Sequence, residues 1–187
     1  MSRQSEQHNR AVVGSYDFSP FRVVADVGGG QGSTLAAILQ VHPALRGILL
    51  DLPEVVASTA PLEAAGVAQR CEVVGGDMLT AVPTGADVYL VKRVLMDWSD
   101  EQAAAILRNC ARACPEDGKV LAVEIVLPPG NDAHPGKILD LLMLLIHPGA
   151  RIRTEAEFAA LFAAAGLRLT KVISTPSPNS ILEATHA

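Results

Sequence analysis

Aromatic residues are scarce in this chain, and that scarcity limits how it can build a core. Only 4% of the 187 residues are Phe, Trp or Tyr, and there is a single tryptophan. Aliphatic side chains must therefore fill the interior, and the many Ala, Val and Leu residues suit helices that cover a parallel sheet. The length allows one substantial core and is short for two domains.

Cysteines are few as well, and they are not arranged as metal ligands. The three cysteines form no CxxC pair and no other spacing typical of a metal site. Cys110 and Cys114 lie on one face of a predicted helix and are most simply read as small buried apolar residues. No metal site is predicted.

A basic run and a long apolar run are also missing. The net charge is −5, and nucleic-acid binding normally needs clustered Lys and Arg, so no nucleic-acid partner is expected. The most apolar segment, ILDLLMLLIHP, is interrupted by Asp140 and His147 and is shorter than the ~20 apolar residues that span a bilayer. The polar N-terminus does not resemble a signal peptide. We therefore expect a cytoplasmic protein with no membrane contact.

Strand-like and helix-like segments alternate along most of the chain. The predicted strands are FRVVADV, RGILLD, CEVVGGD, ADVYLVKR and GKVLAVEIVLP. The predicted helices between them are STLAAILQVHP, the segment from Pro53 to Ala65, and DEQAAAILRNCARAC. Strands separated by helices of this length imply right-handed crossovers and a parallel sheet.

The C-terminal part has a different pattern. A helix is predicted over TEAEFAALFAAAG, with Thr154 as N-cap, Glu157 completing a capping box and Gly166 ending it. Two strands, LRLTKVIST and ILEATH, follow around a PSPNS turn and predict an antiparallel hairpin. The fold class is thus α/β, with a doubly wound, Rossmann-like and mostly parallel seven-stranded sheet. The first twenty residues are expected to form no complete element.

A glycine-rich loop, GGGQG, follows the first strand and opens a helix. Glycine suits a loop that needs positive φ or that lets a ligand approach the backbone. Asp26 precedes the loop, Asp51 ends the second strand and Asp77 ends the third. Since the carboxyl ends of parallel strands meet at one edge, all these groups should lie together there. A tight turn without a ligand is the simpler alternative.

The ligand predicted for this edge is not a dinucleotide. The G-x-G-x-x-G fingerprint would require glycine at position 33, which is Ser33, and no Walker lysine is present. Several acids would also repel a pyrophosphate. They suit a ligand with hydroxyls, an amine and an adenine, which points to S-adenosyl-L-methionine (SAM).

Seven segments in order resemble one family. They are VVADVGGGQG, LLDLPEVV, VVGGDML, LVKRVLMDWSDEQAAAILRNC, VEIVLPPG, LDLLMLLIHPGARIRTEAEF and ILEA. They are similar to the class I SAM-dependent small-molecule O-methyltransferases of the plant phenolic and bacterial polyketide-tailoring type. The resemblance runs from about Phe21 to the C-terminus and implies a small-molecule methyl acceptor.

The resemblance also implies which residues would hold the cofactor. Gly28 and Gly30 would line its site, and Asp51, with Leu52 beside it, would bind the ribose hydroxyls. A carboxylate accepts a pair of hydrogen bonds from a diol, so the residue type suits this role.

Four further residues would surround the adenine according to the resemblance. Asp77 and Met78 would bracket it, Lys92 would lie beside it, and Trp98 would wall the cofactor side of the pocket. Met and Trp offer polarizable faces to a ring. The simpler alternatives are a core methionine, a loop-anchoring tryptophan and a solvated lysine at a strand end.

The chain departs from the family pattern at its start. Family members begin with a helical domain of roughly a hundred residues that dimerises and covers the acceptor. Residues 1–20 are expected to be the stub of such a region, and residues 21–187 the SAM-binding domain. A homodimer of the full-length form, or dependence on a missing N-terminal domain, is expected.

A second departure concerns the catalytic corner, where Met96 and Asp97 precede Trp98. Family members carry the general base, a histidine, at the position of Met96, and many have a glutamate at that of Ile152. A thioether has no useful basicity, so the family mechanism does not transfer unchanged.

Substitutes for the missing base are available on one helix face. Asp140, Met143 and His147 are spaced i, i+3 and i+7 and so share one face of a helix, and the resemblance implies that this helix lines the acceptor pocket. His147 is the candidate base because an unperturbed histidine titrates near neutral pH. Alternatively, it merely ends a helix before Pro148. Glu124, at the end of the fifth strand, would orient a base, bind substrate, or be a satisfied strand-end acid.

Three functions remain open from the sequence. The favoured one is an O-methyltransferase acting on a small aromatic or polyketide-like hydroxyl, acidic enough to need little base catalysis. The second is a SAM-binding relative that has lost methyl transfer and does other tailoring chemistry or none. The third is a non-catalytic partner subunit.

Overall fold

Seven strands form one sheet whose first five members are parallel. The computed structural model describes residues 3–130, 132–146 and 149–187, with the backbone alone at residues 3–5, 135, 144 and 146. The strands in spatial order are β3 (Cys71–Gly75), β2 (Arg46–Asp51), β1 (Val23–Val27), β4 (Val88–Lys92), β5 (Lys119–Glu124), β9 (Ser180–His186) and β8 (Leu167–Ser174). Strand β9 runs antiparallel to both β5 and β8. The predicted fold class is confirmed.

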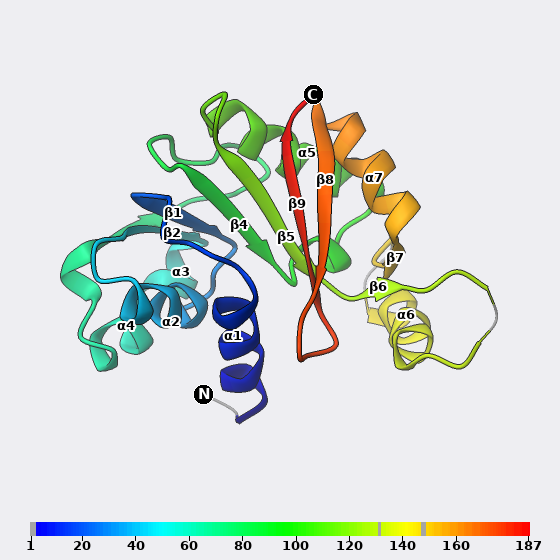
Figure 1. The fold of residues 1–187 in the computed structure, drawn as a ribbon, viewed down its shortest axis with the longest axis horizontal. Coiled ribbons are helices and arrows are strands. Elements are labelled where there is room, and N and C mark those ends of the chain that lie inside the picture. Colours follow the sequence, from blue (N-terminus) through cyan, green and yellow to red (C-terminus); the bar gives the residue numbers. More distant parts are fainter. Residues whose placement is uncertain (1–2, 131, 147–148) are drawn as a thin grey trace.

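Helices cover both faces of this sheet (Figure 1). One face carries α1 (Arg3–Ser15), α2 (Ser33–Val41) and α4 (Ala60–Ala64), and the other carries α5 (Asp100–Ala113) and α7 (Glu155–Ala164). Successive strand residues point to opposite faces, so Val24 and Leu90 join the first core whereas Ala25 and Tyr89 join the second. The central strands β1, β2, β4 and β5 are therefore mostly apolar and buried, as in a sheet covered on both sides, whereas the edge strands β3 and β8 are largely exposed.

The C-terminal prediction is confirmed in detail. Thr154 is the N-cap of α7, and Glu157 completes the capping box by accepting from the Thr154 backbone N–H at 2.8 Å. Gly166 follows the helix with φ +77°, a value that glycine adopts without strain. The hairpin of β9 and β8 then extends the sheet beyond β5, with β8 as the edge strand opposite β3.

A small subdomain extends from the carboxyl end of β5. The predicted fifth strand breaks at Ile125, and its remainder is β6 (Val126–Leu127), which pairs with β7 (Arg153–Thr154). Between them α6 (Pro135–Ile146) stands at the lower edge of the sheet in Figure 1. Four of its large apolar side chains are exposed, namely Ile138, Leu141, Leu142 and Leu145.

The prediction that residues 1–20 form no complete element is wrong. Residues 3–15 form α1, which packs along α2 through Asn9 and Val12. The Asn9 amide donates to Ser33 Oγ at 3.3 Å and accepts from Thr34 Oγ1 at 3.1 Å. Tertiary contacts of this kind stabilise a helix that local propensity alone does not predict.

The predicted helix from Pro53 to Ala65 is also corrected. It consists of two short helices, α3 (Pro53–Val56) and α4. Pro61 lies in the first turn of α4, where proline is tolerated because its missing N–H would have no partner within the helix.

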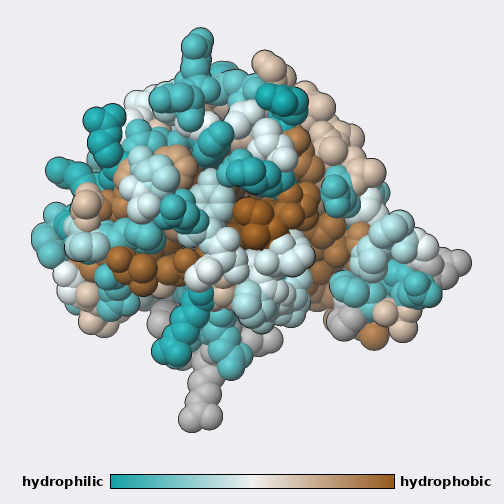
Figure 2. Space-filling view, viewed as in Figure 1, coloured by the Kyte–Doolittle hydropathy of each residue, from teal (hydrophilic) through white to brown (hydrophobic). Residues whose placement is uncertain are grey.

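The surface of the face that carries α1, α2 and α4 is partly apolar. In Figure 2, apolar side chains gather over α2 and α4 and over the middle of the sheet. Val41 at the end of α2 is 60% exposed. Within the described residues, no helix is long and apolar enough to cross a membrane.

Replacing Val12 by Ala tests whether α1 belongs to the folded core. Val12 is 1% exposed, whereas Val41 is 60% exposed. Val12→Ala is expected to lower the free energy of unfolding by about 2 kcal/mol, through lost burial and a residual cavity. Urea unfolding followed by circular dichroism measures this. Val41→Ala is the control and should change stability by less than about 0.5 kcal/mol. Equal effects of both variants would show that α1 is not anchored.

Candidate functional site

The loops that follow β1, β2 and β4 meet at one edge of the sheet. Strand β1 lies between β2 and β4, with Val27 paired to Leu50 and Asp26 to Leu90. The glycine loop after β1 is therefore flanked by Asp51 at the end of β2 and Lys92 at the end of β4. The parallel register brings together the groups that the sequence predicted to meet.

Glycine is favoured at two positions of the loop, Gly28 and Gly30, for different reasons. Gly28 has φ +68°, and a β-carbon on it would lie 2.8 Å from Val94 Cγ2 and 3.2 Å from Met78 Sδ. Gly30 has φ +61°, but a β-carbon there would meet no atom within 4 Å. Packing against the neighbouring loops thus explains Gly28, whereas the backbone at Gly30 borders open space that a ligand can approach.

Asp51 links the second loop to the glycine loop. Its Oδ2 accepts from the Gly30 N–H at 2.7 Å, and its Oδ1 accepts from the Leu52 N–H at 2.8 Å. Each carboxylate oxygen still has capacity for another donor. Leu52 itself is 43% exposed and lies at the start of α3.

The loop that carries Asp77 and Met78 is held by its own turn and by α5. Asp77 Oδ1 accepts from the Leu79 N–H at 2.8 Å. From α5, the Asn109 amide donates to the carbonyls of Met78 and Leu79 at 2.8 and 3.0 Å. Met78 is consequently fixed beside Gly28, as its 3.2 Å approach to the β-carbon position indicates.

Asp26 lies directly behind the glycine loop. Its carboxylate is 1% exposed, and neither oxygen has a hydrogen-bond partner among the described residues. A β-carbon on Gly29 would lie 2.6 Å from its carboxylate carbon, so no side chain fits there. Burial raises the pKa of Asp26 to about 6, although the positive charge of Lys92 opposes the shift. Burial likewise lowers the pKa of Lys92, and Asp26 opposes that change.

Helix α1 also carries His8, to which the sequence gave no role. Burial lowers the pKa of His8, and the positive charges of Arg93 and Lys92 add to the effect. The sequence reading missed His8 because it treated the first twenty residues as a tail. An amphipathic pattern around Asn9 to Val12 is the signal that was available.

Leu95–Trp98, here called the corner segment, follows β4 after a sharp turn. The turn places Arg93 at φ +54°, which is uncommon for a residue other than glycine. The Glu124 carboxylate, 1% exposed, accepts from the N–H groups of Val94 and Leu95 at 3.1 and 2.8 Å. Burial raises its pKa to about 7. Glu124 therefore supports the corner segment, and of the three roles predicted for it, the satisfied strand-end acid agrees best with these contacts.

The side chains of the corner segment face different surroundings. Met96 is 5% exposed and lies in an apolar cluster with Ile125, Met143 and Ile152. Asp97 is exposed, and its backbone N–H donates to the Val94 carbonyl at 3.0 Å. Trp98 is half-buried against the core that contains α5 and α7.

The structure brings part of the predicted acceptor set together. Met143 of α6 contacts the same apolar cluster as Met96. Asp140 instead accepts from the Ile152 N–H through Oδ1 at 2.7 Å and so closes the loop after α6. His147, the predicted substitute base, lies outside the described residues.

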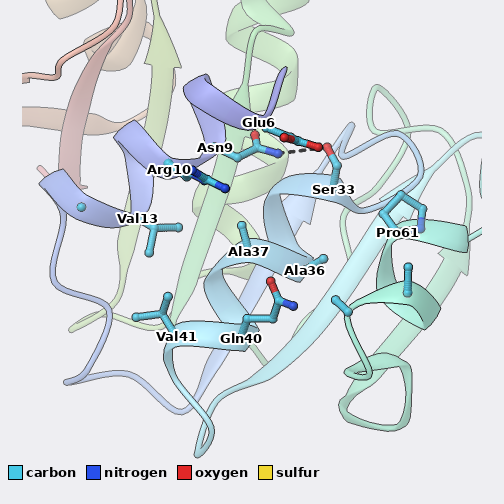
Figure 3. A pocket seen from close by; sticks show the side chains of 13 residues that line it. Glu6, Asn9, Arg10, Val13, Ser33, Ala36, Ala37, Gln40, Val41 and Pro61 are labelled. Carbon is cyan, nitrogen blue, oxygen red and sulfur yellow. Dashed lines mark hydrogen bonds between the residues drawn. The ribbon is translucent and has the colours of Figure 1, made fainter. Parts of the chain in front are cut away.

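A separate cavity of about 700 Å³ lies between α1, α2 and α4. Its lining mixes small apolar residues such as Ala36, Ala37 and Val41 with polar side chains such as Arg10 and Gln40 (Figure 3). None of the predicted cofactor residues lines it. The glycine loop and its acids thus form a site distinct from this cavity.

Comparisons with known proteins agree with the geometry of the edge. The sequence model of the O-methyltransferase domain matches residues 1–168. A phenazine O-methyltransferase from Lysobacter antibioticus is 50% identical over 181 residues, which is 96% of this chain and 53% of that protein.

Two solved structures have the same fold. One is a methyltransferase of calicheamicin biosynthesis in its S-adenosylhomocysteine-bound form, with a TM-score of 0.90 and 45% identity over 98% of this chain and 54% of that one. The other is an O-methyltransferase of neocarzinostatin biosynthesis in complex with SAM and 2-hydroxy-5-methyl naphthoic acid. Its TM-score is 0.87 and its identity 36%, over 97% of this chain and 54% of that one.

The chain spans about half the length of the relatives it matches. The match nevertheless covers most of this chain, and it includes the glycine loop, the acids after β2 and β3, and the corner segment. Together with the seven-stranded sheet, this coverage shows the family: the chain belongs to the O-methyltransferase domain family.

Proposed function

We propose that this chain binds SAM at the carboxyl edge of its sheet and takes part in methyl transfer to a hydroxyl of a small aromatic molecule. The observation that carries the proposal is the cradle formed by Gly30 and Asp51. The carboxylate holds the loop backbone at 2.7 Å while the space above Gly30 stays open. Relatives of the family that are complexed with SAM or S-adenosylhomocysteine support the identity of the ligand.

The residues at the edge suit the chemical groups of SAM. Asp51 has acceptor capacity for the two ribose hydroxyls. Asp26 is a buried carboxylate without a hydrogen-bond partner among the described residues, so it favours a cation nearby. SAM carries both an ammonium and a sulfonium group. Met78 and Trp98, from two different loops, offer polarizable surfaces to the adenine ring.

Bound SAM supplies an electrophilic methyl group, and the protein has to align an acceptor oxygen with it. Met96 and Met143 lie in one apolar cluster next to the corner segment and would pack against an aromatic ring and exclude water. Neither thioether accepts the acceptor's proton. We propose that His147 removes it, or that the acceptor hydroxyl is acidic enough to react as the anion.

We further propose that helices beyond residues 21–187 complete the acceptor site, from an N-terminal helical region or a second copy. Ile138, Leu141, Leu142 and Leu145 on α6 follow the i, i+3, i+4, i+7 spacing of a helix-packing face and are exposed, Leu145 by 84%. A contiguous exposed apolar face of this kind marks an interaction surface. It lies on the same helix as Met143, so its partner would also border the acceptor.

Asp51→Ala tests the cofactor site. The variant loses both the ribose ligand and the bond to Gly30, so the affinity for S-adenosylhomocysteine should fall at least about 10-fold. Isothermal titration calorimetry of the whole chain measures it. Glu54→Ala, an exposed acid on the neighbouring α3, is the control and should bind as the wild type does. Unchanged affinity of Asp51→Ala would refute the ribose assignment.

Asp26→Asn should stabilise the fold and weaken the cofactor site. Because the folded-state pKa of Asp26 is raised to about 6 from 3.8, ionisation destabilises the fold as pH rises between these values. The amide removes this cost, so the gain in unfolding free energy should be about 3 kcal/mol at pH 8 and only about 1 kcal/mol at pH 4.5. Affinity for S-adenosylhomocysteine should decrease.

Urea unfolding at the two pH values provides the measurement for Asp26→Asn. Asp117→Asn, which alters an exposed acid after α5, is the control. A stability difference that is the same at pH 4.5 and pH 8 would mean that the Asp26 carboxylate is not destabilised by burial.

Met96→His tests whether the corner segment faces the reaction. A histidine in this apolar cluster would stay largely neutral at pH 8, as a base must. The rate of methyl transfer from SAM to 2-hydroxy-5-methyl naphthoic acid should rise about 10-fold or more. Met96→His/Ile152→Glu should raise it further, because a carboxylate would orient the ring. Met96→Gln, of similar size, is the control. Equal rates in all variants would place Met96 away from the acceptor.

A further inference from the structure

Residues 151–153 are hydrogen-bonded to backbone carbonyl groups of the corner segment, whereas Glu124 binds N–H groups at its start. The Arg151 N–H donates to the Met96 carbonyl at 2.9 Å. The Arg153 guanidinium donates to the Leu95 carbonyl at 2.7 Å and to the Trp98 carbonyl at 2.9 Å. Three of the four carbonyl groups of the corner segment are thus held by a segment more than fifty residues away in sequence.

Arg153 is buried to an unusual degree for an arginine. Its side chain is 1% exposed, and its Nε donates to Asp100 Oδ1 at 2.8 Å. Burying a guanidinium is costly unless its donors are satisfied. Here one planar group bridges two carbonyls and a carboxylate, which fixes the distance between the ends of the corner segment.

The same segment also reaches the helix that borders the acceptor. The Ile152 N–H donates to Asp140 of α6 at 2.7 Å. The side chain of Ile152 packs in the cluster that contains Met96 and Met143. Arg153 therefore lies next to three elements. It is paired with Val126 of β6, it is bonded to the corner segment, and its neighbour Ile152 is bonded to α6.

The corner segment in turn connects the two halves of the proposed site. On its cofactor side, Val94, the residue directly before the corner segment, packs against Gly28 of the glycine loop. On its acceptor side, Met96 packs with Met143. A shift of its backbone would change the distance between the two halves, and alignment of the reacting groups is what methyl transfer depends on most.

We propose that Arg153 is a positioning residue for methyl transfer, which sets the corner segment, and with it Met96 and Trp98, between the cofactor loop and the acceptor helix. The proposal rests on the function proposed above. Arg153 touches neither cofactor nor acceptor and acts through the carbonyls it binds. Lysine cannot replace it, because an ammonium group lacks the planar fork that reaches both carbonyls at once.

The sole tryptophan allows a test that does not depend on activity. Trp98 is the only tryptophan of the chain, so fluorescence excited at a wavelength that the tyrosines do not absorb reports on the corner segment alone. In Arg153→Lys and Arg153→Met, acrylamide should quench this fluorescence roughly twice as strongly, because the segment opens locally more often. Circular dichroism of both variants should remain that of a folded chain.

The matched control is Arg151→Met. The Arg151 side chain forms ion pairs with Glu157 and Asp100 at the surface, while its link to the corner segment uses only the backbone N–H. Its removal should leave the quenching unchanged. Asp100→Ala removes the carboxylate that binds Arg153 but keeps the arginine, so quenching should be intermediate. This variant still tests the proposal if the Arg153 variants do not fold.

Kinetics complete the experiment. For Arg153→Lys, kcat for the naphthoic acid acceptor should fall at least about 10-fold, since misplacement by an ångström costs on the order of 100-fold. The dissociation constant of S-adenosylhomocysteine should rise less than about threefold, because only the contact with Trp98 is loosened while Asp51 and the glycine loop are untouched. Arg151→Met should match the wild type in both quantities.

Each outcome separates this proposal from the one it rests on. Wild-type transfer with unchanged kcat and quenching in the folded Arg153→Lys would overturn the role of Arg153 alone. Increased quenching with unchanged kcat would show that Arg153 stabilises the corner segment without affecting methyl transfer, and would also overturn the proposal. A wild-type chain that binds S-adenosylhomocysteine but transfers no methyl group to any phenol would overturn the proposed function and, with it, the role of Arg153 in positioning for methyl transfer. The quenching data would then still decide whether Arg153 holds the corner segment.

Discussion

The parallel pairing of β1 with its two neighbours is the constraint on which the rest of the site depends. It fixes the glycine loop between the ends of β2 and β4, so Asp51 can bond Gly30 and Val94 can pack on Gly28. Because both faces of the sheet are covered by helices, the central strands β1, β2, β4 and β5 carry mostly apolar side chains, and most of their polar groups lie at or next to the strand ends. The chemistry of the molecule is thus concentrated along one edge.

Much of this arrangement follows from the sequence because its signals are local. The strand ends with their acids, the glycine loop and the capping box at Thr154 and Glu157 each lie within a few residues. Helix α1 was missed because its stability comes from Asn9 and Val12 packing on α2, a long-range contact. The break before α4 was missed for a related reason: Pro61 is as acceptable in a first turn as it is disruptive in a helix interior.

Arg153 shows the limit of such reading most clearly. In the sequence it is one arginine of two in ARIRT, and nothing local separates it from Arg151. The difference arises from tertiary position, since Arg153 is 1% exposed and Arg151 is 38% exposed. Only the fold places the first against the carbonyls of the corner segment and the second at the surface. The sequence shows that Met96 stands where family members carry the histidine base. It does not show that Met96 is packed among apolar side chains, which include Met143 and Ile152.

Ionisation of the two buried acids at this edge, Asp26 and Glu124, destabilises the fold. Burial raises the pKa of Asp26 to about 6 and that of Glu124 to about 7, so each binds protons more tightly when folded, and ionisation near neutral pH destabilises the chain. Glu124 is compensated by the N–H groups of Val94 and Leu95. Asp26 has no hydrogen-bond partner among the described residues. The positive charge of Lys92 opposes part of the rise in the pKa of Asp26, and the cationic groups of bound SAM would oppose it further.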